Sequence, residues 1–386
     1  MPRPDSSVPD RRVRLVVDAT AIPPDRGGVG RYLEALLPEL SALDLEVVVV
    51  CQERDRAALA EQSPAARTVA VPRALERRAV RLVWEQLGLP RLVRRLRADV
   101  VLSPHYTMPL LTRRPVVVML HDATFFSHPE LHTRAKRSFF RTATRIAVRR
   151  AATLLVPSRA TRDEAVRFTG ARPEQFVVAL HGVDPGVFHV VGAPERERVA
   201  RSLGLEQQGY VAFLGTLEPR KNVPALVRGW VAAVSGLDHP PALVLAGGRG
   251  WDEDVDPAVA AVPPGLRVVR PGYLPLEDLA GFLGGARVVA YPSLGEGFGL
   301  PVLEAMACGA AVLTTPELSL AEVGGDAVAY TGTGADEIAA ALAALLADES
   351  RRRDLGAAAL ARAREFTWAS SARAHREAVL AALARR

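Results

Sequence analysis

The sequence predicts an α/β protein made of two doubly wound parallel-sheet domains that face each other across a cleft. Short runs of β-branched and aliphatic residues alternate with segments of helical periodicity, which is typical of parallel sheets covered by helices on both faces. The alternation occurs once before residue 190 and again after it. A chain of 386 residues is also too long for one ordinary core and suits two domains.

We expect the first domain to cover residues 1–190 and the second to cover residues 191–366. The first contains five runs expected to be strands, at residues 13–18, 45–51, 99–104, 115–122 and 152–158. The second contains six, at residues 209–215, 242–248, 266–272, 286–293, 310–315 and 327–332. Between them, the polar residues 188–209 are expected to form a linker with a short helix. An amphipathic helix in residues 367–386 ends the chain.

Positive charge is concentrated in the first half of the chain. The net charge is +6, because an excess of ten basic residues before position 191 is offset by four acidic ones after it. Two stretches, Arg73 to Arg97 and Arg134 to Arg150, supply most of the excess. Arginine interleaved with aliphatic residues at helical spacing is compatible with contact with an anionic membrane, and equally with an ordinary amphipathic helix. Nucleic acid is a poorer partner, since no binding motif or aromatic stacking platform accompanies the arginines.

Cysteine usage and hydropathy argue for a cytoplasmic protein. Cys51 and Cys308 are alone in their predicted domains, which excludes a disulfide framework or a zinc cage. The first twenty residues lack the apolar core of a signal peptide, and no apolar run is long enough to cross a bilayer. We therefore expect no tightly bound metal and a cytoplasmic location.

The most informative segment is PSLGEGFGLPVLEAMACG, residues 292–309, which follows a predicted buried strand. Pro301 favours the start of a helix there, because its missing N–H is not needed in the first turn. Glu296 then lies in a loop and Glu304 in the helix. The N–H groups of Gly297 to Leu300, together with the positive end of the helix dipole, predict a site for an anionic or hydroxyl-rich ligand.

Carboxylates suit a sugar or a ribose, because each accepts hydrogen bonds from two neighbouring hydroxyls. The spacing allows Glu296 to bind the sugar end and Glu304 the ribose end of a sugar nucleotide. The alternative for Glu304 is an ordinary solvated helix start, where glutamate is favoured in any case.

Lysine is rare in this chain, which makes its positions informative. Of 49 basic residues only Lys136 and Lys221 are lysines. Lys221 follows Arg220, and a point charge beside a planar guanidinium suits the oxygens of a diphosphate. Lys136 has no comparable neighbours, so we expect it on the surface.

Two further motifs lie where predicted strands end. Gly28 belongs to GGVG, residues 27–30, whose backbone can approach a phosphate or an acceptor, although neither the dinucleotide fingerprint nor a P-loop is present. His121 and Asp122 end a strand, where a histidine capped by its neighbour is the simplest explanation. A metal-dependent HD phosphohydrolase would need more histidines and aspartates than we can assemble.

The segment at residues 296–309 strongly resembles the E-x7-E signature of the retaining group 1 glycosyltransferases of the GT-B fold. Seven other segments resemble the same family, in its order. They are GGVGRY (27–32), HDATFF (121–126), VPSRATRDE (156–164), HGVD (181–184), FLGTLEPRKN (213–222), GYLPLEDLA (272–280) and FTW (366–368). Together they span nearly the whole chain.

This resemblance implies a role for particular residues. Arg220 and Lys221 would neutralise the leaving diphosphate, and Glu296 with the N–H groups of Gly297, Phe298 and Gly299 would hold the sugar. The remaining donor-binding residues implied by the family are Gly28, Gly215, Gly272, Tyr273, Leu274, Leu300 and Glu304, with His121 beside the sugar. The last helix would pack back onto the first domain. The front-face displacement common in such enzymes is favoured here because no second carboxylate is evident in the first domain.

The resemblance is closest to mannosyltransferases of polysaccharide and lipid-linked glycan assembly, which makes GDP-mannose the first expected donor. A UDP-hexose used with a small-molecule acceptor is the second. The sequence also leaves open a nucleotide-sugar epimerase of the same fold and a non-catalytic scaffold. The presence of Lys221, Glu296 and Glu304 argues against the scaffold, and epimerases lack this EGFGLPVLE pattern.

Overall fold

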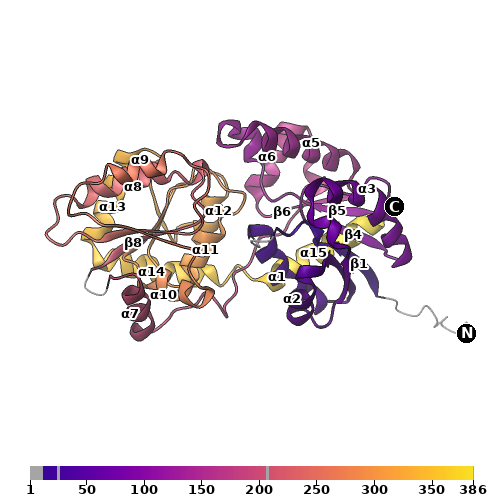
Figure 1. Ribbon diagram of the computed structural model, residues 1–386, viewed down its shortest axis with the longest axis horizontal. Helices are drawn as coiled ribbons and strands as arrows, with labels where there is room; N and C mark the ends of the chain where they lie inside the picture. The colour runs from indigo at the N-terminus through magenta and orange to yellow at the C-terminus, as the bar shows by residue number, and fades with distance from the viewer. Residues whose placement is uncertain (1–11, 24–26, 206–207, 386) are drawn as a thin grey trace, which may run out of the picture.

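The computed structural model describes residues 12–23, 27–205 and 208–385, which form two parallel sheets with helices on both faces. Figure 1 shows the sheets as two lobes, one drawn in indigo to magenta and the other in pink to yellow. The α/β class and the two-sheet architecture predicted from the sequence are confirmed.

The first sheet has seven parallel strands in the order β3-β2-β1-β4-β5-β6-β7. Their bounds are β1 Val13–Asp18, β2 Leu45–Gln52, β3 Arg67–Val71, β4 Val100–Ser103, β5 Val116–Met119, β6 Thr153–Val156 and β7 Phe176–Val178. Alternate residues of the central strands belong to two separate buried clusters, one on each face of the sheet. Strands buried on both faces explain the continuous aliphatic runs in the sequence.

In the described residues, six helices before residue 170 accompany the first sheet. They are α1 Gly27–Ser41, α2 Arg56–Gln62, α3 Arg78–Arg95, α4 Thr124–Ser127, α5 Arg134–Arg150 and α6 Arg159–Thr169. The two basic stretches of the sequence correspond mainly to α3 and α5. Within α3, however, Arg81 does not belong to a basic surface, because it is buried and pairs with Glu85. A carboxylate one helical turn away neutralises the arginine inside the domain.

The second sheet has six parallel strands in the order β10-β9-β8-β11-β12-β13. These strands are β8 Tyr210–Leu214, β9 Ala242–Ala246, β10 Val268–Gly272, β11 Val288–Tyr291, β12 Val312–Thr314 and β13 Ala329–Tyr330. Its helices are α7 Ala193–Ser202, α8 Val223–Val234, α9 Val255–Ala260, α10 Leu279–Gly285, α11 Leu300–Ala307, α12 Ser319–Gly324, α13 Ala335–Ala347 and α14 Glu349–Ala363. All six predicted strands are present.

The chain passes between the domains twice, and the two crossings lie side by side. Near the first, the ring of His181 stacks on that of Trp368, with 5.5 Å between the ring centroids. The Val183 N–H donates to the Phe366 carbonyl at 3.2 Å. A Cβ at Gly182 would lie 2.2 Å from the Trp368 nitrogen, so only glycine allows this approach. The two crossings are therefore held together by a hydrogen bond and by ring stacking, and are not two independent linkers.

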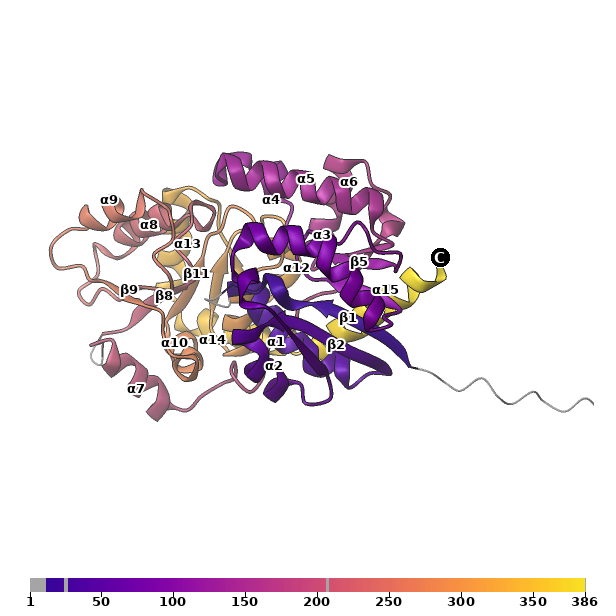
Figure 2. The same cartoon turned by 45° about the vertical axis from the view of Figure 1, so that its right-hand side comes forward.

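After the second crossing, helix α15 (Trp368–Ala384) returns to the first domain. It packs against α1 and the strands β4 to β7, and Figures 1 and 2 both show it in the lobe of β1. Its His375 is hydrogen-bonded to Tyr32 of α1. Among the helices in the described part of the chain, none is long and apolar enough to cross a membrane.

Candidate active site

The candidate site lies at the carboxyl ends of β8 and β11, where the strand order of the second sheet reverses. Doubly wound sheets bind ligands in the crevice outside such a reversal. The loop after β8 carries Arg220 and Lys221, and the loop after β11 carries Glu296. Residues about 75 positions apart are thus brought into contact.

Glu296 is the centre of a buried polar cluster. Both Arg220 and Lys221 form ion pairs with its carboxylate. On the lysine side, Oε1 also accepts hydrogen bonds from Tyr291 Oη at 3.0 Å and Ser293 Oγ at 2.9 Å. Four groups of the same domain therefore hold one carboxylate in a fixed orientation.

The cluster fixes the charge of its members. Burial opposes ionisation of Glu296, but Arg220 and Lys221 together outweigh it and lower the pKa of Glu296 to about 2. Burial lowers the pKa of Lys221 below its ordinary value, an effect that Glu296 only partly offsets. For Arg220, the burial effect is overcome by Glu296 and Asp122, so its pKa is raised. At neutral pH Glu296 is an anion and Arg220 a cation.

A row of unpaired backbone donors follows Glu296. In the described residues, the N–H groups of Gly297, Phe298 and Gly299 donate to no other group. Gly299 adopts a φ of +98°, which suits glycine, and immediately precedes α11. The first residue of α11, Leu300, is followed by Pro301 as the sequence predicts. Free N–H groups at the start of a helix suit an anion or hydroxyl oxygens.

Glu304 lies in α11, faces the other domain and is far less constrained. Its Oε1 accepts a hydrogen bond from Arg31 of α1 at 3.0 Å, whereas no described group bonds to its Oε2. Burial raises the pKa of Glu304, and Arg31 reduces this effect. Both residues line a cavity of 960 Å³ between the domains. Glu304 therefore retains an oxygen that no described group bonds, in a residue that lines the cavity.

His121 lies on the opposite side of the site, after β5 of the first domain. Its Nε2 is 2.6 Å from the Pro104 carbonyl, which requires the proton to be on Nε2. Burial lowers the pKa of His121 to about 4. The ring is therefore neutral at pH 7, and Nδ1 is left as a hydrogen-bond acceptor.

Three residues that sequence reasoning did not assign also belong to the site. Asp122 lies 3.6 Å from Arg220 across the domain boundary, so the first domain does bring a carboxylate to the cleft. The sequence led us to expect no carboxylate suitable as a nucleophile in the first domain, and the pairing of Asp122 with Arg220 does not test that expectation. Tyr291 and Ser293, which hold Glu296, come from the strand end just before the recognised motif. Position at a strand end was the available signal for all three.

The other predicted residues lie at strand ends or near the start of a helix. Gly215 follows β8, and its carbonyl is so close to Gly247 that a Cβ there would lie 2.3 Å away. Gly272 ends β10 with a φ of +77°, and Tyr273 after it is 72% exposed. Leu274 is half-buried beside them. Gly28 is the second residue of α1, and a Cβ built on it would meet no atom within 4 Å.

Lys136 lies on the surface, as predicted, but it does not lack neighbours. It is exposed, but its ammonium lies 3.8 Å from the ring centroid of Trp251 in the second domain. A cation over an aromatic face at this distance is attractive. The lysine therefore links α5 to the loop after β9.

The two facing domains and the polar cluster at the strand reversal define a GT-B type of enzyme that acts on a nucleotide sugar. The sequence matches the family described as Glycosyltransferase Family 4 at residues 26–187, and that described as Glycosyl transferases group 1 at residues 195–362. The chain belongs to the group 1 glycosyltransferases. It is therefore a retaining hexosyltransferase with a nucleotide-sugar donor.

Several relatives agree with this membership. The O-antigen chain mannosyltransferase B of Escherichia coli is 32% identical over 273 residues, which cover 69% of this chain and 70% of that protein. The D-inositol 3-phosphate glycosyltransferase of Kribbella flavida is 35% identical over 229 residues, 53% of this chain and 50% of the relative.

Solved structures share the fold at low identity. HepE of Anabaena in complex with UDP-glucose has a TM-score of 0.76 and 18% identity, covering 94% of this chain and 98% of that one. WaaG, a glycosyltransferase involved in lipopolysaccharide biosynthesis, has a TM-score of 0.69 and 18% identity, covering 91% and 95%.

Proposed function

We propose that the protein transfers mannose from GDP-mannose to a hydroxyl group of a growing glycan, polysaccharide or lipid-linked acceptor. The observation that carries the choice of sugar is the similarity to the mannosyltransferase of O-antigen chains, which extends over more than two thirds of both chains. In this proposal residues 191–366 bind the donor, residues 1–190 bind the acceptor, and residues 367–386 tie the two together.

In this proposal, different residues of the polar cluster bind different parts of the nucleotide sugar. Arg220 and Lys221 neutralise the diphosphate as it leaves, because two adjacent cations stabilise charge that develops in the transition state. Glu296 and the free N–H groups of Gly297 to Gly299 bind the sugar hydroxyls. Glu304 binds the ribose through its unpaired Oε2. The base is read by backbone groups near residues 272–274.

His121 completes the sugar site from the acceptor side. Since its ring is neutral and Nδ1 is an acceptor, it can take a hydrogen bond from a sugar hydroxyl without adding charge beside the reacting carbon. Most of the rate enhancement then comes from positioning and from stabilising the leaving group. Front-face displacement within this arrangement needs no tightly bound metal or other cofactor.

A UDP-hexose donor with a small-molecule acceptor is the second candidate. The small-molecule acceptor is favoured by the similarity to a D-inositol 3-phosphate glycosyltransferase, which spans about half of this chain. The cluster around Glu296 serves either donor equally, because it faces the diphosphate and sugar rather than the base.

Titration calorimetry with GDP, UDP, ADP and dTDP distinguishes these candidates. We expect GDP to bind at least tenfold more tightly than the others, and GDP-mannose to be turned over in the presence of a mannose-ended glycan. Selective binding of UDP would replace mannose with a UDP-hexose. Binding of none of the four would contradict the donor site itself.

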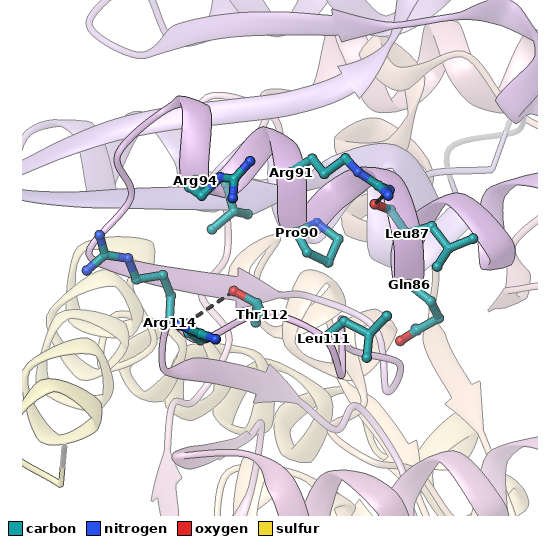
Figure 3. Close-up of a pocket in the computed structure, with 10 residues that line it drawn as sticks. Gln86, Leu87, Pro90, Arg91, Arg94, Leu111, Thr112 and Arg114 are labelled. Carbon is teal, nitrogen blue, oxygen red and sulfur yellow. Dashed lines mark hydrogen bonds between the residues drawn. The ribbon is translucent and has the colours of Figure 1, made fainter.

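We also propose that the protein contacts the cytoplasmic face of an anionic membrane through α3 and the loop after β4. Four exposed aliphatic residues gather there, Val80, Val83, Leu87 and Leu111, the last being 64% exposed. Figure 3 shows Leu87 and Leu111 beside a cavity between α3 and the loop. The described residues that line this cavity include four arginines and no carboxylate. The arginines are Arg91, Arg94, Arg113 and Arg114.

This combination fits a lipid surface, because apolar side chains enter the headgroup region while arginines bind phosphates. We expect co-sedimentation with vesicles of anionic lipid that is lost at high salt and absent with zwitterionic lipid. Arg91→Glu with Arg94→Glu should abolish it, whereas Arg149→Glu with Arg150→Glu on α5 should not. Equal binding of both double variants would contradict the assignment of this surface.

A further inference from the structure

The N-terminus of α6 in the first domain is hydrogen-bonded to the loop of the second domain that contains Gly297, called the Gly297 loop below. Ser158 Oγ donates to the Gly297 carbonyl at 2.7 Å, and Thr161 Oγ1 donates to the same oxygen at 3.0 Å. Both residues are buried: Ser158 is 0% exposed and Thr161 is 3% exposed. A carbonyl oxygen has two lone pairs, so the two hydroxyls satisfy it completely.

Two further contacts hold the same junction together. Glu322 of α12 accepts hydrogen bonds from the N–H groups of Arg159 at 2.8 Å and Ala160 at 3.4 Å, so a carboxylate of one domain caps a helix of the other. A Cβ at Gly297 would lie 1.9 Å from the His121 carbonyl oxygen. The loop therefore fits against the first domain only because residue 297 is glycine.

The hydrogen bonds that orient the Gly297 carbonyl also orient the N–H group of the next residue, Phe298, because both groups belong to one planar peptide. The described peptide bonds include no cis bond, and in a trans peptide the C=O and N–H groups point in opposite directions. With its carbonyl directed at α6, the peptide that joins Gly297 to Phe298 must direct the Phe298 N–H away from α6. The preceding peptide is fixed within its own domain, because Ser319 Oγ donates to the Glu296 carbonyl at 2.7 Å.

We propose that Ser158 and Thr161 are positioning residues for the donor sugar, acting across the domain boundary through the Gly297 carbonyl. One domain anchors the Glu296 carboxylate, and the other sets the direction of the backbone donor beside it. The sugar subsite is complete only when the two domains are in contact, whereas Arg220 and Lys221 are in place without the first domain's hydroxyls. This inference rests on the proposed role of the Gly297 loop in binding sugar.

The test compares Thr161→Val, which removes one hydroxyl at nearly constant shape, with Thr161→Ser, which keeps it. We expect kcat with the nucleotide sugar to fall about three- to tenfold in Thr161→Val and to stay within about twofold in Thr161→Ser, in line with the loss of one hydrogen bond. The Kd of the nucleoside diphosphate without sugar should change less than about twofold in both. Thr144→Val is the matched control, since the Thr144 hydroxyl is buried and has no partner in the described residues.

Adding Ser158→Gly to Thr161→Val removes both donors while retaining a residue that is acceptable at a helix N-cap. The double variant should lose roughly ten- to a hundredfold in kcat. Equal losses in Thr161→Val and Thr161→Ser, or a parallel loss of nucleoside diphosphate binding, would overturn the proposal.

Hydrogen exchange provides a readout that needs no donor. In Thr161→Val the amides of residues 295–300 should exchange faster than in the wild type or in Thr144→Val. Unchanged exchange would overturn the contact itself. Faster exchange in a protein that turns over no nucleotide sugar would instead sustain the contact and contradict the proposed function.

Discussion

Glu296 and Glu304 differ sharply although they are the two ends of one nine-residue motif. Glu296 has four partners, all within its own domain, and its pKa is lowered to about 2 against the effect of burial. Glu304 has one described hydrogen-bond partner, Arg31 of the other domain, and burial raises its pKa. One carboxylate is ionised and held by four groups, whereas the other has one described partner and an oxygen that no described group bonds.

The difference shows that similar residues in one motif have different physical requirements. A group next to the reacting bond benefits from preorganisation, because no reorganisation is then needed in the transition state. A group that binds the distant end of a substrate benefits from a free lone pair. Variants at the two positions should therefore affect different measurements.

The largest effect is expected at the preorganised carboxylate. Glu296→Ala and Lys221→Ala should each reduce kcat by at least about a hundredfold, since either change removes charge next to the leaving diphosphate and sugar. The measurement is initial rate with the identified donor, with circular dichroism to verify folding. Glu277→Ala in the same domain is a suitable control. Near-normal rates in either site variant would contradict the assignment.

Stability at low pH gives a second test of Glu296. Its folded-state pKa of about 2 lies below the ordinary value of 4.5, so its stabilising effect is complete above 4.5 and is lost as the pH falls toward 2. Glu296→Gln cannot titrate. The difference in unfolding free energy between wild type and Glu296→Gln should therefore shrink by about 2 kcal/mol from about pH 5 to about pH 3, as measured by urea denaturation. A constant difference over that range would contradict the ion-pair cluster.

At Glu304 we expect the opposite pattern. Glu304→Gln should weaken nucleoside diphosphate binding about tenfold, because charge-assisted hydrogen bonds to the ribose become neutral ones. The unfolding free energy should stay within about 1 kcal/mol or rise, because the variant no longer buries a carboxylate with an unpaired oxygen. Calorimetry and thermal melts measure the two quantities. Glu39→Gln, which lines the same cavity, should leave both unchanged.

The smallest effect is expected at Asp122, which faces Arg220 from the other domain. Asp122→Asn retains the hydrogen bond that Oδ1 accepts from the Thr124 N–H at 2.6 Å and removes only the charge. The kcat/KM should fall about three- to tenfold, in keeping with one partly buried charge interaction. A loss above about a thousandfold would contradict this limited electrostatic role for Asp122.

The sequence predicts the central strands well and misses two strands at sheet edges. β3 has only Val71 buried and β7 only Phe176, and both are short, so neither shows the continuous aliphatic run of a strand covered on both faces. Edge strands are determined by their neighbours more than by their own composition. Their existence therefore depends on tertiary pairing that one segment cannot reveal.

The site is predicted in a similarly uneven way. Arg220, Lys221 and Glu296 could be assigned to one site because each follows a predicted strand and because the resemblance to the family groups them. The pairings of Glu304 with Arg31, and of Gly297 with Ser158, join residues more than a hundred positions apart in different domains. Such contacts depend on how two rigid bodies meet, which local patterns do not encode.

The paired crossings at Gly182 and Trp368 have a mechanical consequence. A single linker lets two domains both twist and bend relative to each other. Two linkers joined side by side by hydrogen bonds and ring stacking restrict the domains to rotation about one axis. We therefore expect three contacts between the domains to form and break together. They are Arg31 with Glu304, Thr161 with Gly297, and Lys136 with Trp251, in which the residues of the first domain come from three different helices.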